Sequence, residues 1–169
     1  GRLIEVGRQD LVGKYVGWTA KNVAEAFDRA RGSVLFIDEA YSLCDDRTGS
    51  YGDEAINTIV QFMENRKDNT VVIFAGSPDK MQGFLDRNPG LRSRIAYHIN
   101  FKDYSIDELL QILELQAKEN SLRLDPEAVS KAKNIIGQAL SRKDFGNGRF
   151  VRNLMESARV NQVSRIMAA

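Results

Sequence analysis

Two adjacent carboxylates follow an apolar run in the first part of the chain. The run Val34–Ile37 consists of four apolar residues, and Asp38 and Glu39 come directly after it. Such a run is typical of a strand buried on both faces of a parallel sheet, and ligands gather at the carboxyl ends of such strands. There Asp38 can hold Mg²⁺, directly or through water, and Glu39 can orient or deprotonate a water for attack on a phosphate. On the dipeptide alone, a solvated turn carrying two acids is the alternative.

Alternating strand and helix patterns surround these two acids. Short apolar runs predict strands over Leu3–Val6, Val34–Ile37, Val71–Ala75 and Ala96–Phe101. Helical spacing predicts helices over about Ala20–Arg31, capped by Thr19 and ended by Gly32, and over Asp53–Asn65, after a polar loop at Asp45–Gly52. Strands that alternate with helices favour an α/β fold with a parallel sheet, which would place the two acids at one edge.

The strand patterns stop after Phe101, and three helices are expected in the remainder. Ser105 with Glu108 forms a capping box, Asp125 precedes a proline at a second helix start, and a third helix begins at about Gly148. The sequence therefore predicts an α/β core over residues 1–101 and a small all-helical unit over residues 102–169.

The acidic segment resembles a known family. Val34–Ala40 is similar to the Walker B motif of AAA+ ATPases. The run Asp38–Leu43, followed by Tyr51–Ala55, resembles the stage V sporulation protein K group, which includes the red-type Rubisco activase. The likeness extends from Leu3 to about Ala158 and implies a partial AAA+ P-loop-type core followed by a helical lid. It also implies a motor that forms a ring, a hexamer when intact, and uses ATP to thread or remodel protein substrates.

Further roles follow from this resemblance at matching positions. Tyr15, Val16 and Gly17 match the aromatic–hydrophobic–glycine loop that grips substrate in the pore of AAA+ unfoldases, with a surface turn as the alternative. Arg94 aligns best with the arginine finger, which reaches the γ-phosphate of the neighbouring subunit, and Arg92 is the second choice.

Two more positions match family sensors of the nucleotide. Ser77 occupies the sensor 1 position, which commonly holds Asn, so a plain turn is an equal alternative there. Arg149 is the expected sensor 2 in the lid, and Arg152, one turn further on, is the alternative.

The phosphate-cradling loop G-x-x-x-x-G-K-[ST] does not occur in the sequence. Gly13 and Lys14 match the Gly-Lys pair near the end of this motif. However, Arg8 occupies the position of the required first glycine, and Tyr15 occupies the position of the required Ser or Thr. In the family this loop precedes the strand that begins here at Leu3, so we expect a chain truncated after it. ATP and Mg²⁺ are then expected as cofactors only when the loop is present, and the fragment alone is expected to be inactive.

Composition excludes several other classes. The net charge of +1 gives no global field toward nucleic acid, and no apolar run is long enough to cross a membrane. A single cysteine, Cys44, excludes an internal disulfide and fits a cytoplasmic location. With one cysteine and one histidine, His98, a zinc site is not credible. Two alternatives to a protein-remodelling motor stay open: a nucleic-acid-directed AAA+ motor and a non-catalytic interaction module.

Overall fold

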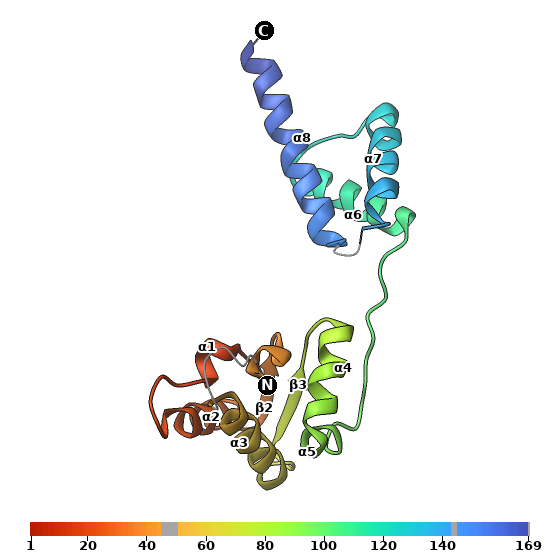
Figure 1. The fold of residues 1–169 in the computed structure, drawn as a ribbon. Helices are drawn as coiled ribbons and strands as arrows, with labels where there is room; N and C mark the ends of the chain where they lie inside the picture. Colours follow the sequence, from red (N-terminus) through yellow and green to blue (C-terminus); the bar gives the residue numbers. More distant parts are fainter. Residues whose placement is uncertain (45–50, 143–144, 169) are drawn as a thin grey trace. The chain divides into compact units, whose positions relative to one another are not determined.

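The chain folds into two compact units. The computed structural model describes residues 1–44, 51–142 and 145–168, and the units are Gly1–Asn100 and Phe101–Ala169 (Figure 1). Each unit is described by itself. Residues 45–50 of the expected polar loop lie outside the described residues, and its last two residues, Tyr51 and Gly52, belong to the following helix.

A three-stranded parallel sheet forms the centre of the first unit. Its strands are β1 (Leu3–Val6), β2 (Ser33–Ile37) and β3 (Thr70–Phe74), in the spatial order β1-β2-β3. Three of the four expected strands are thus confirmed. Because all three run in the same direction, the residues that follow β1, β2 and β3 meet at one edge of the sheet.

Helices cover one face of this sheet. The helical elements of the unit are α1 (Arg8–Leu11), α2 (Trp18–Arg29), η1 (Ala40–Cys44), α3 (Tyr51–Asn65), α4 (Pro78–Arg87) and α5 (Pro89–Arg92). Leu35 and Ile37 of β2 are fully buried in one apolar cluster with Val23 and Phe27 of α2 and Ile59 of α3. This cluster fixes the position and direction of β2, and therefore the position of Asp38 and Glu39, which follow it.

The start of α2 differs from the expectation. The helix begins at Trp18, so Thr19 is not its cap. Thr19 is instead buried, and its Oγ1 accepts a hydrogen bond from the Gly13 N–H at 3.0 Å. The buried hydroxyl satisfies a buried backbone donor, which explains why a threonine lies inside the helix. Gly17 precedes the helix with φ +79°, in the left-handed region that favours glycine.

The other face of the sheet is largely open. The register places Leu3, Val34 and Val71 in one row, and Glu5, Phe36 and Ile73 in another row on the same face. Leu3 is 61% exposed, Val71 59% and Ile73 42%, whereas Val34 and Phe36 are half-buried. The expectation that the strands are buried on both faces is wrong for this face, because no described helix lies over it closely enough to bury these side chains.

The fourth expected strand, Ala96–Phe101, is not a strand in the structure. Tyr97, Ile99 and Phe101 alternate along it, but each is more than four-fifths exposed, and His98 between them is exposed too. A strand forms only when a neighbour completes its hydrogen bonds, and within the described residues β3 pairs with β2 alone. The alternation was therefore insufficient to predict a strand here.

The open face gives a first testable prediction. Exposed contiguous apolar surface favours self-association, so we expect the 169-residue chain to associate as its concentration rises. Replacing Val71 and Ile73 together by Thr keeps β-branched side chains but removes apolar surface, and should reduce the association measured by light scattering. Replacing Val160 and Val163 by Thr, which are 62% and 53% exposed in the second unit, is the matched control. A wild-type chain that stays monomeric at high concentration would contradict the prediction.

The described residues of the second unit form three helices: α6 (Ile106–Glu119), α7 (Pro126–Ala139) and α8 (Gly148–Ala168). The expected capping box is confirmed, since the Ser105 N–H donates to Glu108 Oε2 at 2.7 Å and the Glu108 N–H donates to Ser105 Oγ at 3.3 Å. Two hydrogen bonds lower the pKa of Glu108: the one from the Ser105 backbone has the larger effect, and the one from the Ser105 hydroxyl has the smaller. Asp125 caps α7 by accepting from the Ala128 N–H at 2.6 Å.

An apolar core holds these helices together. Leu109 and Leu113 of α6 are buried against Ile136 of α7 and against Val151 and Met155 of α8. In the part of the chain that the structure describes, no helix has both the length and the apolar character needed to cross a membrane.

Candidate functional site

The two acids lie at a hollow on the carboxyl edge of the sheet. Asp38 and Glu39 directly follow β2 and are both exposed. The hollow has a volume of about 370 Å³ and is lined by Glu5, Val6, Gly7, Arg8, Gln9, Asp10, Asp38, Glu39 and Ser42. It therefore joins the residues that follow β1 to the acids that follow β2, at the edge where ligands bind in parallel sheets.

The backbone at the acids is held on both sides. The Asp38 N–H donates to Val6 O of β1 at 3.0 Å, and the Ala40 N–H donates to Ala75 O, beyond β3, at 3.0 Å. Between them Glu39 has φ +46°, and its own N–H donates to Asp38 Oδ1 at 2.9 Å. A residue other than glycine in this region costs on the order of 1–3 kcal/mol and persists where its surroundings impose it. Hydrogen bonds to the ends of both neighbouring strands supply that constraint.

The donor set fits a magnesium ion better than a metal that needs many protein ligands. Among the described residues no group of three or more His, Cys, Asp or Glu side chains could hold a metal. Mg²⁺ is commonly bound through one or two carboxylates, with water and substrate phosphates as its other ligands. Asp38, exposed beside an open hollow, suits that role, whereas a structural metal site would require more ligands.

Arg8 braces the segment that follows the acids. Its guanidinium Nη1 donates to the carbonyl of Ser42 and to that of Leu43, the latter at 3.2 Å. Gly52, at the start of α3, packs so closely that a Cβ there would lie 1.9 Å from Leu43 O. These contacts connect the end of β1, η1 and α3 around the hollow. Sequence reasoning treated Arg8 only as a departure from the phosphate-binding loop and did not single out Gly52.

Ser77 follows β3 at the same edge of the sheet. It is exposed and precedes α4 in the N-cap position, without a side-chain cap hydrogen bond, while the Met81 N–H donates to Ser77 O at 2.9 Å. The segment is thus the beginning of a helix rather than a plain turn. Its hydroxyl is free to turn toward the edge that Asp38 shares, but a role toward a nucleotide stays a prediction.

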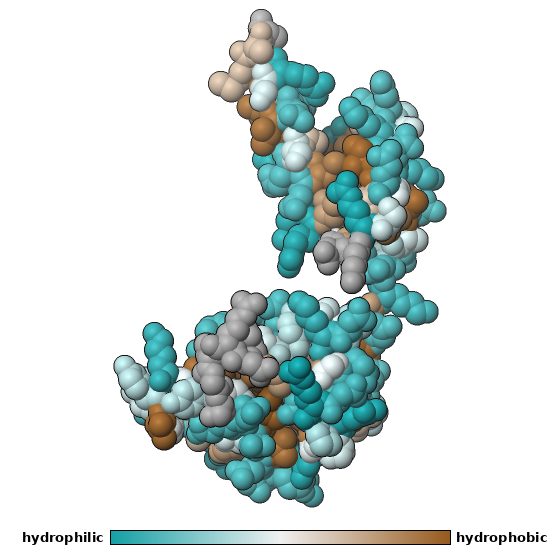
Figure 2. Space-filling model, in the orientation of Figure 1, coloured by the Kyte–Doolittle hydropathy of each residue, from teal (hydrophilic) through white to brown (hydrophobic). Residues whose placement is uncertain are grey.

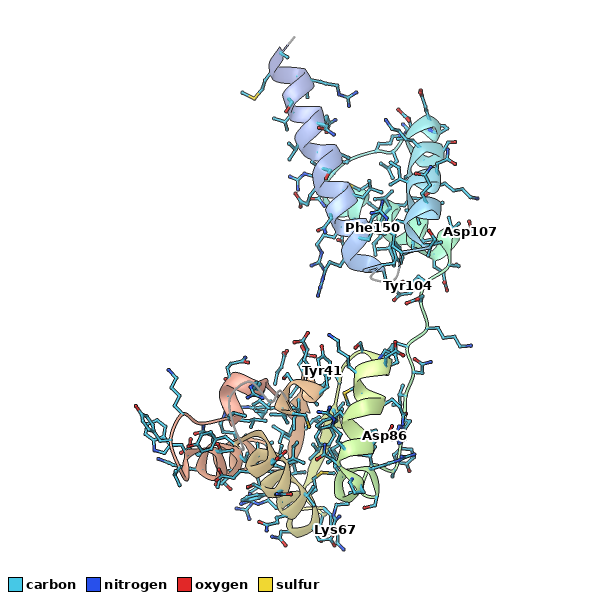
Figure 3. All side chains as sticks on the ribbon, in the orientation of Figure 1. Tyr41, Lys67, Asp86, Tyr104, Asp107 and Phe150 are labelled. Atoms are coloured by element: carbon cyan, nitrogen blue, oxygen red, sulfur yellow. The ribbon has the colours of Figure 1, made fainter. Side chains whose placement is uncertain are left out.

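Both arginine-finger candidates are engaged at the surface of their own unit. Arg92 Nη1 pairs with Asp86 Oδ1 of α4 at 2.8 Å, and Figure 3 labels Asp86 on that helix. Arg94 Nη1 donates to Gly90 O at 2.9 Å, and its Nε lies 3.5 Å from Glu64 Oε2. Exposed ion pairs contribute about 0–1 kcal/mol, so either side chain can be released toward another molecule at small cost.

The loop between α1 and α2 stands out from the unit. Tyr15 is 62% exposed and Val16 85%. The tyrosine is therefore not packed into the core, and the choice between a substrate-gripping loop and a surface turn stays a prediction.

Arg149 lies in the first turn of α8 and Arg152 in the following turn, and both are exposed. Asn147, just before them, has φ +47° and joins the helix to the segment that enters the second unit. Its Oδ1 accepts from the Tyr104 N–H at 3.0 Å, and its Nδ2 donates to Asp103 Oδ1 at 2.7 Å. Sequence reasoning did not identify Asn147, because its partners lie 43 and 44 residues away.

The site as described predicts weak nucleotide binding by this chain alone. Backbone N–H groups and a lysine of a phosphate-binding loop make most phosphate contacts in P-loop enzymes, and the sequence lacks that motif. We therefore expect isothermal titration of the 169-residue chain with Mg–ATP to give no binding in the micromolar range. Heat consistent with micromolar affinity would contradict this prediction.

Comparisons with known proteins cover the whole chain. Residues 1–103 match the ATPase family associated with various cellular activities (AAA), and residues 105–169 match the AAA lid domain. The chain is 45% identical over 170 residues to protein CbbX of Cereibacter sphaeroides, covering all of this chain and 55% of that protein. It is 46% identical over 169 residues to the chloroplastic ribulose bisphosphate carboxylase/oxygenase activase of Cyanidioschyzon merolae, covering 99% of this chain and 58% of that protein.

A solved structure supports the fold. The AAA domain of FIGL-1 in complex with ADP matches 96% of this chain and 52% of that chain, with a TM-score of 0.67 at 20% identity. The chain spans little more than half the length of the curated relatives that it matches.

Proposed function

The chain belongs to the AAA family of ATPases, and from that premise we propose that the protein is an ATP-driven ring motor that remodels or threads protein substrates. The placement of Asp38 and Glu39 carries the proposal. They adjoin a hollow at the carboxyl edge of a parallel sheet, with the backbone fixed by both neighbouring strands.

The two acids would have different roles in ATP hydrolysis. Asp38 would hold Mg²⁺, which neutralises phosphate charge when bound. Glu39 would accept a proton from the attacking water, since its carboxylate is exposed and its backbone is fixed. Ser77, at the same edge, would help to position that water.

The arginines would act across and within subunits. Arg94, or Arg92 as the second choice, would reach the γ-phosphate bound by a neighbouring subunit, which requires a closed ring; we propose a hexamer. Arg149, or Arg152, would contact the nucleotide of its own subunit from the lid. Guanidinium groups suit both tasks because they remain charged and offer several donors in a fixed plane.

The similarity to CbbX and to a ribulose bisphosphate carboxylase/oxygenase activase supports a protein as the substrate. We also propose that the chain belongs to the wider stage V sporulation protein K group, on the motifs Asp38–Leu43 and Tyr51–Ala55. The exposed loop with Tyr15, Val16 and Gly17 would grip the substrate, because an aromatic ring makes a large contact that tolerates many sequences.

Substituting Tyr15 tests the proposed substrate class. In the assembled, ATP-hydrolysing protein, we expect Tyr15→Ala to lose most of its protein-remodelling rate, measured with a fluorescent unfolding substrate. Tyr15→Phe keeps the ring and should retain most of that rate. Because Tyr15 is exposed, neither change should alter the melting temperature. Unaltered remodelling by Tyr15→Ala would place substrate gripping on another surface, and a wild-type protein that remodels no protein substrate would favour a nucleic-acid-directed motor.

A further inference from the structure

A second aromatic ring lies beside Tyr15. The rings of Tyr15 and Trp18 meet edge to face, with centroids 5.0 Å apart and planes inclined at 68°. Trp18 is 55% exposed, so its ring is not buried by the helix that it begins. Figure 2 shows hydrophobic atoms at the edge of the first unit where Figure 1 draws the loop between α1 and α2. Val16, between them in the sequence, is exposed as well, and we name these three residues the aromatic pair loop (Tyr15, Val16 and Trp18).

The backbone under this loop is well fixed. The Gly13 N–H donates to the buried Thr19 hydroxyl, and the Trp18 N–H donates to Tyr15 O at 3.2 Å. A Cβ at Gly13 would lie 2.5 Å from Trp18 Cβ, so the two ends of the loop touch. A loop closed in this way loses little freedom when it binds a partner, which favours binding.

We propose that Trp18 is a second substrate-gripping residue. Its ring holds the Tyr15 ring outward and, together with it, forms a contact surface for a large apolar side chain of an extended polypeptide. This inference rests on the proposed function of the loop, and it names the kind of segment that the loop selects.

The charge beside the loop defines that segment further. Lys14 is exposed, and the structure gives its ammonium no ion pair with any described residue. Lys21, by contrast, lies 3.8 Å from Glu25. An unpaired cation next to two rings favours a partner with an acidic residue beside its apolar side chain. The expected occupant is therefore an extended peptide with a large apolar residue flanked by Asp or Glu.

Nuclear magnetic resonance can test this directly. Trp18 is the only tryptophan of the chain, so its indole N–H gives a single signal. Titration of the ¹⁵N-labelled chain with a peptide carrying Phe between glutamates should shift that signal and the amide signals of Val16 and Gly17. Trp18→Ala should weaken binding by about 2- to 10-fold, the range expected for one aromatic contact, and Trp18→Phe should recover most of it. Affinity in both variants is read from the Val16 and Gly17 amides.

Two controls separate a specific role from a structural one. A peptide with Phe between lysines should bind more weakly than the acidic peptide. In the free chain, Tyr15→Leu should move the indole signal of Trp18, because it removes the neighbouring ring. The amide signals of the buried residues Leu11 and Val23 should keep their positions in every variant, since both rings are exposed.

The outcomes distinguish this inference from the proposed function. Peptide binding that Tyr15→Ala weakens and Trp18→Ala leaves unchanged overturns the inference and leaves the substrate class intact. A single-stranded oligonucleotide that binds the loop more tightly than the acidic peptide overturns both, whereas a wild-type chain that binds no peptide overturns the inference alone. An indole signal unmoved by Tyr15→Leu overturns the contact between the two rings.

Discussion

Replacing Arg94 by Ala is expected to lower the rate of ATP hydrolysis by about 10³–10⁵-fold, the effect of an arginine finger in other phosphoryl-transfer enzymes. The protein to be measured is the assembled ring whose subunits contain both this chain and a phosphate-binding loop. The guanidinium would stabilise charge that develops on the transferred phosphate. Its contacts with Gly90 O and Glu64 lie at the surface, so their loss should change stability little. Phosphate release by the purified variant measures the effect.

Arg92→Ala is the matched control, since it removes an arginine two positions away and its pair with Asp86. It should hydrolyse ATP at nearly the wild-type rate. A larger loss of ATP hydrolysis in Arg92→Ala than in Arg94→Ala would instead identify Arg92 as the arginine finger. A finger that acts between subunits, as proposed, predicts that rings mixed from Arg94→Ala and Glu39→Gln protomers hydrolyse ATP faster than either variant alone. A finger that acts within its own subunit would give no such gain.

Glu39→Gln is expected to lower hydrolysis by about 10²–10⁴-fold while ATP still binds, the contribution typical of a positioned general base. Glutamine has nearly the same shape as glutamate but cannot accept the proton of the attacking water. The measurement combines phosphate release with nucleotide affinity in the protein that carries a phosphate-binding loop.

Glu5→Gln provides the control for charge, because Glu5 lines the same hollow but lies within β1 rather than after a strand. If the two variants lost equal activity, the net negative charge of the hollow would matter and not a proton acceptor at position 39. Full activity in Glu39→Gln would remove Glu39 from the reaction.

Local patterns were sufficient to predict much of this fold. The capping box at Ser105 and the helix start after Asp125 depend on residues close together in the sequence, and both formed as expected. The strand that precedes Asp38 was predicted from its own apolar run. These features are determined by interactions within one element, which the sequence displays directly.

Long-range contacts could not be predicted in the same way. Residues 96–101 alternate as a strand would, but a strand also requires a neighbour, which no local pattern supplies. Arg8 reaches carbonyls 34 and 35 residues away, and Gly52 is constrained by one of those carbonyls. The resemblance at Tyr51–Ala55 includes Gly52 but gives it no structural role, and it gives none to Arg8, because the constraint arises only when β1, η1 and α3 come together.

The positive φ of Glu39 bears on whether the chain works as an enzyme or only as a scaffold. A left-handed position is occupied most comfortably by Gly, with Asn and Asp next. A module that only binds partners would gain stability from Gly there and lose nothing. A glutamate at such a position gives up some stability, as active-site residues commonly do, and this fits the catalytic task proposed for its carboxylate. The backbone angle thus supports the catalytic alternative independently of any motif.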